Sequence, residues 1–170
     1  MIYAVVWAII VCQRILEVLI AKRNEQWMKE QGGKVIHERI YYWIVLTHIL
    51  FLVAIILEGG LKGFFSYPIQ PVYLFLFLLL QAFRLWCLFS LGKFWNTKVI
   101  VMENVTLIKK GPYKYIRHPN YVVVGLEFIV IPLLFHSYLT AVLFPILHII
   151  LMKYRIPLED EALGRIKEPT

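Results

Sequence analysis

Residues 121–152 read YVVVGLEFIVIPLLFHSYLTAVLFPILHIILM, an apolar run with one acidic residue and no lysine or arginine. A helix that crosses the hydrocarbon core of a bilayer needs about 20 residues, so this run is too long for one crossing. It is broken at residues 135–137 (Phe-His-Ser), which predicts a tight helical hairpin of two shorter spans. Pro132 and Pro145 are candidate kink positions, because proline has no backbone N–H to donate.

Three further apolar segments precede the hairpin, at residues 2–21, 40–57 and 72–91. The chain is 60% hydrophobic with a mean hydropathy of +0.69, which leaves too few polar residues to cover a soluble domain of this size. The first segment has no early basic residue, which favours a retained span over a cleaved signal peptide. The sequence therefore predicts an all-α integral membrane protein with about five transmembrane helices, the last two forming the hairpin.

At 170 residues the chain has the length of one domain, and we expect a single membrane domain over 1–170. Residues 1–92 hold the first three spans, and residues 93–170 are expected to form the functional core. Within this second part, the runs 99–102 and 105–108 flank a polar pair, which predicts a short strand hairpin.

Basic residues fall almost entirely on one side of the predicted membrane. Fifteen lysines and arginines lie in the segments 22–39, 93–120 and 153–170, against Lys62 on the other side. Basic loops face the cytosol, so we expect a multi-pass protein of the cell membrane with its N-terminus outside and its C-terminus in the cytosol. Anionic membrane lipids account for the formal net charge of +7, and nucleic-acid binding is not expected.

Several charged residues are embedded in the apolar segments, where they are functional candidates by default. Arg14 and Glu17 are three positions apart on one helix face, which favours a simple ion pair. For Arg84 and Glu127, a functional role and a structural pairing both stay open.

The histidines and cysteines in the spans are weaker functional candidates than the charged residues. His48 and His148 are expected to be hydrogen-bonded interior residues. Cys12 and Cys87 have neither a CxxC partner nor a neighbouring histidine, so no metal site is predicted.

The most unusual polar segment joins the third span to the hairpin and reads GPYKYIRHPNY at residues 111–121. Its tyrosines alternate with bases, and Pro119 disfavours helix at His118, so irregular backbone is predicted there. One reading is an ordinary interfacial belt of aromatic and basic anchors. The other is a site for an anionic or sulfonium-bearing cofactor, because guanidinium binds carboxylates and aromatic faces attract cations.

A second cluster, RIPLEDEAL at residues 155–163, follows the hairpin and places acids on an otherwise basic face. It fits a solvated amphipathic terminal helix. A hairpin, however, returns both of its ends to the same membrane face, so the two clusters are also expected to meet and form one pocket.

Together the two motifs resemble the isoprenylcysteine carboxyl methyltransferase family of integral-membrane enzymes, which use S-adenosylmethionine. The family pattern is roughly G-P-Y-x-x-x-R-H-P-x-Y, a helical hairpin, and R-x-x-x-E-[ED]-x-x-L, and the likeness covers about residues 90–163. The segment FWNTK at 94–98, with Glu127, resembles a bacterial branch of the family. Members commonly continue through a further short segment, so the part that covers the cofactor is expected to be shorter here.

The resemblance implies a cytosolic pocket for S-adenosylmethionine lined by Tyr113, Arg117, His118, Pro119, Tyr121 and Glu159. In this pocket Glu159 would bind the amino group of the cofactor and His118 would hold its polar end. Arg155 and Glu159 are the implied catalytic residues, with Arg155 in contact with a carboxylate. A sulfonium methyl group is already activated, so neither a metal nor a catalytic triad is expected.

The acceptor is expected to enter from the bilayer as a lipophilic molecule that is methylated on a carboxylate or hydroxyl. Acceptors of isoprenoid type, or of the alkyl-pyrone or phenolic lipid type of the bacterial branch, fit this description. The candidate substrate-binding residues are Arg84, Trp95, Asn96 and Glu127. Two alternatives stay open: an NADPH-dependent membrane reductase of sterol-reductase-like type, which carries a similar RHPNY element, and a non-enzymatic membrane protein.

Overall fold

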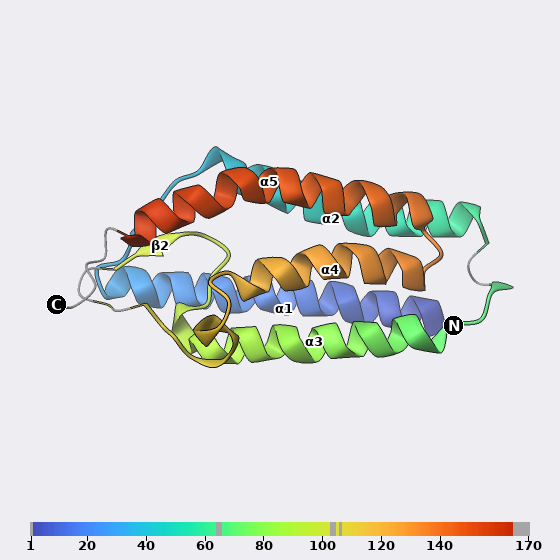
Figure 1. Ribbon diagram of the computed structural model, residues 1–170, viewed down its shortest axis with the longest axis horizontal. Helices are drawn as coiled ribbons and strands as arrows, with labels where there is room; N and C mark the ends of the chain where they lie inside the picture. Colours follow the sequence, from blue (N-terminus) through green and yellow to red (C-terminus); the bar gives the residue numbers. More distant parts are fainter. Residues whose placement is uncertain (1, 64–65, 103–104, 106, 165–170) are drawn as a thin grey trace.

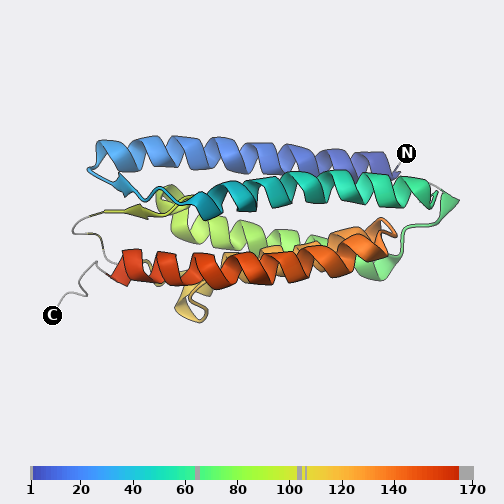
Figure 2. The same ribbon diagram turned by 90° about the horizontal axis from the view of Figure 1, so that it is seen from above.

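The computed structural model describes residues 2–63, 66–102, 105 and 107–164. Its α-helices run along the long axis of the molecule (Figure 1, Figure 2) and are α1 (Ile2–Glu30), α2 (Arg39–Leu61), α3 (Pro71–Leu91), α4 (Pro119–Leu134) and α5 (Tyr138–Gly164). In the described part of the chain, four of them are long and apolar enough to cross a membrane, and α4 is shorter at 16 residues. The chain is an all-α integral membrane protein, as predicted.

The predicted helical hairpin is confirmed as α4 and α5, joined by a turn in which His136 has a φ of 56°. The hydroxyl of Ser137 donates to the carbonyl of Ile55 on α2 at 2.9 Å, which attaches the turn to that helix. Glu58, also on α2, accepts two backbone N–H groups from the first turn of α5 at 2.9 and 2.8 Å. These amides have no partner within α5 itself, so the hairpin depends on α2 to satisfy them.

Two helices extend beyond the apolar segments that predicted them. α1 continues past Ala21 to Glu30, and pairs such as Lys29 with Glu25 at 2.6 Å support its polar end. α5 continues past Met152 to Gly164, so the acidic cluster lies on the last turns of the same helix that enters the bilayer.

A two-stranded ladder connects the first and third loops. β1 (Lys34–Val35) pairs antiparallel with β2 (Ile100–Val101), in the register Lys34 with Val101 and Val35 with Ile100. The sequence correctly placed a strand within 99–102. The partner predicted for this strand, 105–108, is wrong, because Ile100 and Val101 pair with β1 instead. Residues 103, 104 and 106 of that predicted hairpin lie outside the described residues. The ladder draws the loop before α2 toward the segment that follows α3.

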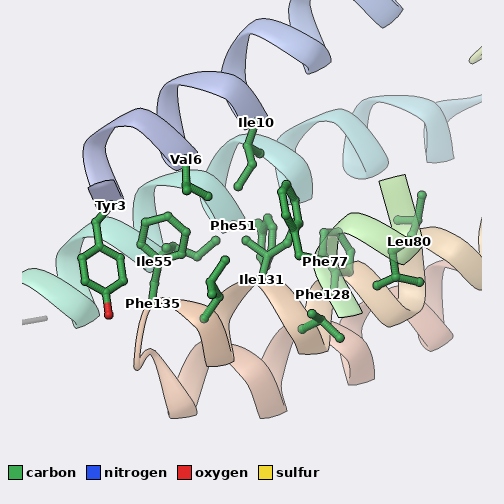
Figure 3. Packing of buried hydrophobic residues seen from close by; sticks show 13 residues of the cluster. Tyr3, Val6, Ile10, Phe51, Ile55, Phe77, Leu80, Phe128, Ile131 and Phe135 are labelled. Carbon is green, nitrogen blue, oxygen red and sulfur yellow. The ribbon is translucent and has the colours of Figure 1, made fainter. Parts of the chain in front are cut away.

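Apolar side chains from four helices meet in one cluster around α4 (Figure 3). α1 contributes Tyr3 and Ile10, α2 contributes Phe51, and α4 contributes Phe128 and Ile131, all nearly fully buried. The outward faces of the long helices carry exposed leucine, isoleucine, valine and phenylalanine side chains, which suit contact with lipid tails. The start of α1 and the end of α5 lie at opposite ends of the bundle (Figure 1), and β2 lies at the α5 end.

Candidate functional site

The first motif forms a short 3-10 helix, η3 (Gly111–Lys114), followed by an irregular stretch that ends where Pro119 begins α4. His118 has φ −126° and ψ 61°, outside the helical region, which confirms the irregular backbone predicted before Pro119. The side chains of this stretch therefore point at a different angle from those of α4, toward the end of α5.

Glycine is required at the start of η3. Gly111 has a φ of 54°, and a Cβ atom at this position would overlap the hydroxyl of Ser90 and lie 3.0 Å from Nε1 of Trp86. We expect Gly111→Ala to lower the free energy of unfolding in detergent by about 2 kcal/mol, from the left-handed backbone and the contact with α3 together. Gly32→Ala is the control, because Gly32 also has a positive φ, of 85°, and an added Cβ atom there would meet nothing within 4 Å. Denaturation by sodium dodecyl sulfate would measure both losses, and equal losses would contradict the close contact.

The two motifs meet at the end of the α4–α5 hairpin. Nε2 of His118 lies 3.0 Å from a carboxylate oxygen of Asp160, and Nδ1 lies 3.8 Å from Glu159. The imidazole stacks on the ring of Tyr121 at a centroid distance of 5.5 Å, and the Tyr121 hydroxyl donates to Glu159. Arg117 reaches Asp160 at 3.4 Å from a largely exposed position. The predicted meeting of the basic and acidic clusters is therefore observed.

Arg155 lies beneath this cluster and is almost completely buried. Its Nε donates to the Tyr121 hydroxyl at 3.2 Å and lies 3.7 Å from Glu159. Its two terminal nitrogens donate to the carboxylate of Glu38 and to the carbonyl of Thr97, the latter at 3.2 Å. A planar guanidinium with five N–H donors suits such a set of separate acceptors.

Glu38 is a site residue that the sequence did not indicate. It lies in a short loop whose other charged residues are mostly basic, and its side chain is only 4% exposed. The β1–β2 ladder brings this loop to the end of α5, where Arg155 binds the carboxylate. No local spacing connects residues this far apart, so only the fold reveals the pair.

A cavity of about 420 Å³ opens beside the two motifs. Its polar lining includes Tyr113, Arg117, His118, Glu159 and Asp160. The rest of the lining is mainly apolar and comes from the ends of α1, α3 and α5 and from Val99, Ile100, Met102, Val105, Leu107 and Ile108. The cavity thus combines paired carboxylates, bases and an apolar wall.

The charge states of two polar side chains of the cavity, Tyr113 and Lys98, follow from their surroundings. Burial, followed by the nearby Cys87 and Glu159, raises the pKa of the Tyr113 phenol well above its usual value, so the hydroxyl stays protonated. The ammonium of Lys98 contacts both carboxylate oxygens of Glu25, at 2.9 and 3.1 Å, and this hydrogen bonding raises the pKa of the lysine. Lys98 therefore keeps its positive charge, and much of that charge is already neutralised by Glu25.

The remaining sequence candidates divide into those beside the cavity and those away from it. Asn96 lines the cavity and donates to the carbonyl of Ala21 at 3.0 Å. Tyr121 and Arg155 lie behind the lining and hold it in place, and Pro119 begins α4. Trp95 is 3% exposed and packs with Ala21 and Leu88 rather than lining the cavity.

Arg84 and Glu127 belong to a buried charge network between α1, α3 and α4. Nη1 of Arg84 donates to Glu127 at 2.8 Å, while its Nε and Nη2 bind both oxygens of Glu17 at 2.5 and 2.6 Å. Arg14 binds Glu17 at 2.9 Å, which confirms the predicted pair, and also binds Glu127 at 2.7 Å. The side-chain amide of Gln81 also donates a hydrogen bond to Glu127, at 3.0 Å. The two arginines balance the two carboxylates, and none of the four lines the cavity.

The interior histidines are hydrogen-bonded, as predicted. His148 contacts the carbonyl of Tyr121 at 3.0 Å, and His48 contacts the carbonyl of Ile44 at 2.8 Å. Cys12 and Cys87 are both free thiols. Among the residues that the structure describes, no group of three or more histidine, cysteine or acidic side chains is placed to hold a metal ion.

The described chain is thus a small integral-membrane helical bundle with a polar cavity at the end where the two motifs meet. The sequence model of the isoprenylcysteine carboxyl methyltransferase (ICMT) family matches residues 72–165, more than half of the chain, and the protein belongs to this family. The family comprises membrane methyltransferases that use S-adenosylmethionine.

Two curated relatives extend the likeness over nearly the whole chain. The uncharacterized protein YpbQ of Bacillus subtilis (strain 168) is 44% identical over 161 residues, which cover 92% of this chain and 93% of the relative. An uncharacterized protein of Haemophilus influenzae is 21% identical over 163 residues, which cover 95% of each chain. No solved structure matches the chain.

Proposed function

We propose that this membrane methyltransferase binds S-adenosylmethionine in the cavity between the two motifs and methylates a carboxylate or hydroxyl of a lipophilic acceptor. The observation that carries the proposal is the cavity in which His118 faces Glu159 and Asp160. These residues come from opposite ends of the hairpin, and the matched family region spans both of them.

The residues present fit the cofactor. The carboxylate of Glu159 suits the amino group, and Arg117 and His118 suit a carboxylate at the same polar end. The apolar wall from α1, α3 and the described residues between Val99 and Ile108 that line the cavity suits the adenosyl part. A volume of about 420 Å³ lies within the range of roughly 300–1,000 Å³ that is usual for small-molecule sites. When bound, the cofactor supplies an activated methyl group.

The protein's own residues then have to orient the reactants and exclude water. Arg155 acts as a positioning residue, because it holds Tyr121 and Glu159 together from behind the lining. An acceptor carboxylate is already ionised at neutral pH and needs no base. An acceptor hydroxyl of ordinary acidity needs a proton acceptor, and the His118–Asp160 pair in the cavity is the arrangement that we propose for this role.

The proposed acceptor enters from the bilayer, and an isoprenoid or an alkyl-pyrone or phenolic lipid fits this route. Among the sequence candidates for acceptor binding, Asn96 lines the cavity, which supports this role for it. For Arg84 and Glu127, mutual pairing in a charge-balanced network favours the structural alternative. The concentration of basic loops supports a cytosolic cavity in the cell membrane, with residues 93–170 as the core that binds the cofactor.

The reductase alternative is disfavoured by the charge of the site. The 2′-phosphate of NADPH requires concentrated positive charge, whereas Glu159 and Asp160 place two carboxylates in the cavity. The family match also supports methyl transfer over reduction.

Heat stability in detergent tests the proposal. S-adenosylmethionine or S-adenosylhomocysteine at about 100 times its dissociation constant should stabilise the protein by about 2.7 kcal/mol, and NADPH should not. Glu159→Gln should remove this stabilisation, whereas Glu161→Gln, an exposed acid on the same helix, should retain it. Stabilisation by NADPH alone would overturn the assignment. Incubation of native lipid extract with the protein and labelled S-adenosylmethionine would then identify the acceptor by its labelled product.

A further inference from the structure

A second depression, of about 480 Å³, lies next to the cofactor cavity. It is formed by Trp27 near the end of α1, by the end of α3 and the short 3-10 helix η2 (Gly92–Phe94), and by residues 108–110. Leu91, Phe94, Ile108 and Lys109 line both spaces and so form a common wall. None of the sequence motifs and none of the residues proposed for methyl transfer accounts for this depression.

The lining of the depression is basic and aromatic. Its charged residues are Lys93, Lys109 and Lys110, and the described lining contains no acidic side chain. The ammonium of Lys93 lies 5.1 Å from the centre of the Trp27 ring, and that ring packs edge-on against Phe94 at 5.5 Å. Three lysines thus line the same depression as the aromatic rings of Trp27 and Phe94.

Three other lysines of the described chain are paired with carboxylates. Lys29 and Lys98 are paired with Glu25, and Lys62 is paired with Glu58. Among the described contacts, neither Lys93 nor Lys110 has a carboxylate partner. Their charge is available to an anionic ligand.

The position of the depression matches the headgroup layer of a bilayer. The apolar segment of α1 ends at Ala21, and Trp27 lies six residues further on, about 9 Å along the helix axis. Phe89, which also lines the depression, is 73% exposed on α3 near the end of its apolar segment. One edge of the depression therefore meets lipid tails, and the other presents ammonium groups at the depth of lipid phosphates.

We propose that this depression binds the headgroup of an anionic phospholipid, with Lys93 and Lys110 on the phosphate and Trp27 and Phe89 along the lipid. Basic pockets between membrane helices on the cytoplasmic side recognise such headgroups by the same chemistry. The proposal does not depend on methyl transfer. Because Leu91, Phe94 and Ile108 also line the cofactor cavity, a bound lipid would stabilise one wall of that cavity.

The test measures binding of single lipid molecules to the purified full-length protein in neutral detergent by native mass spectrometry. Detergent removes the diffuse potential of a membrane surface, so only a built site distinguishes phosphatidylglycerol from phosphatidylcholine. Lys93→Gln/Lys110→Gln should weaken phosphatidylglycerol binding about twenty-five-fold, since each lysine contributes roughly a fivefold factor. The control Lys22→Gln/Lys153→Gln removes the same charge from two other exposed positions and should change binding less than about twofold.

Three outcomes would overturn the proposal. Equal weakening by both double variants would mean that overall charge, and not the depression, attracts the lipid. Equal binding of phosphatidylglycerol and phosphatidylcholine to the unaltered protein would remove the charge preference. Displacement of phosphatidylglycerol by an equal concentration of inorganic phosphate would mean that the site takes the phosphate group without the lipid.

Discussion

Arg84→Met is expected to destabilise the protein by about 3–5 kcal/mol, the usual cost of removing one partner from a buried ion pair. The two shortest charged contacts of Glu17 are both with Arg84, which also binds Glu127. Methionine is a shorter, unbranched side chain without charge, so the variant leaves two buried carboxylates with Arg14 as their remaining arginine. Unfolding by sodium dodecyl sulfate in mixed micelles measures the loss.

Two further variants separate charge from packing. Arg117→Met removes an arginine whose side chain is 79% exposed, and should cost less than about 1 kcal/mol. Arg84→Met/Glu17→Met removes one charge of each sign and should be more stable than Arg84→Met alone. If the double variant were less stable than the single one, packing rather than charge balance would explain the importance of Arg84.

Arg155→Lys is expected to weaken S-adenosylhomocysteine binding about tenfold to a hundredfold, because hydrogen bonds to charged groups contribute about 1.5–3 kcal/mol each. Arginine serves Glu38, Thr97 and Tyr121 at once through three different nitrogens. A lysine keeps the charge but places it at one point, so Tyr121 and Glu159 lose their common support. Calorimetric titration of the detergent-solubilised protein gives the affinity.

Arg39→Lys is the matched control, since Arg39 is exposed at the start of α2 and does not line the cavity. It should leave the affinity unchanged within about twofold. Tyr121→Phe removes only the hydroxyl between Arg155 and Glu159 and should give a smaller loss than Arg155→Lys. Unchanged affinity in Arg155→Lys would show that the guanidinium does not position the cofactor site.

The sequence was most informative where one local signal sufficed. The apolar run with Phe135-His136-Ser137 in its middle predicted the α4–α5 hairpin, and Pro119 predicted where α4 begins. Because a hairpin returns both ends to one face, the meeting of His118 with Glu159 and Asp160 could also be expected. These contacts follow from the hairpin topology, which a local feature of the sequence predicts.

Features that depend on distant partners could not be predicted in this way. A two-residue ladder such as β1–β2 is too short for a periodic pattern to reveal its partner. Apolar segments mark only the part of a helix within the hydrocarbon, so the polar end of α1 after Ala21 was missed. Arg84 and Glu127 were recognisable as intramembrane charges, but the four-residue network that neutralises them was not.

The pairing of Glu38 with Arg155 also bears on the order of assembly during synthesis. Glu38 leaves the ribosome 117 residues before its partner, so the carboxylate has no guanidinium to bind while most of the chain is being made. It can be buried only after α5 has been inserted and its last turns have reached the β1–β2 ladder. The cavity is therefore expected to be among the last parts of the molecule to form, and a chain truncated before Arg155 would keep α1 to α4 and the first part of α5 but not Glu159 and Asp160.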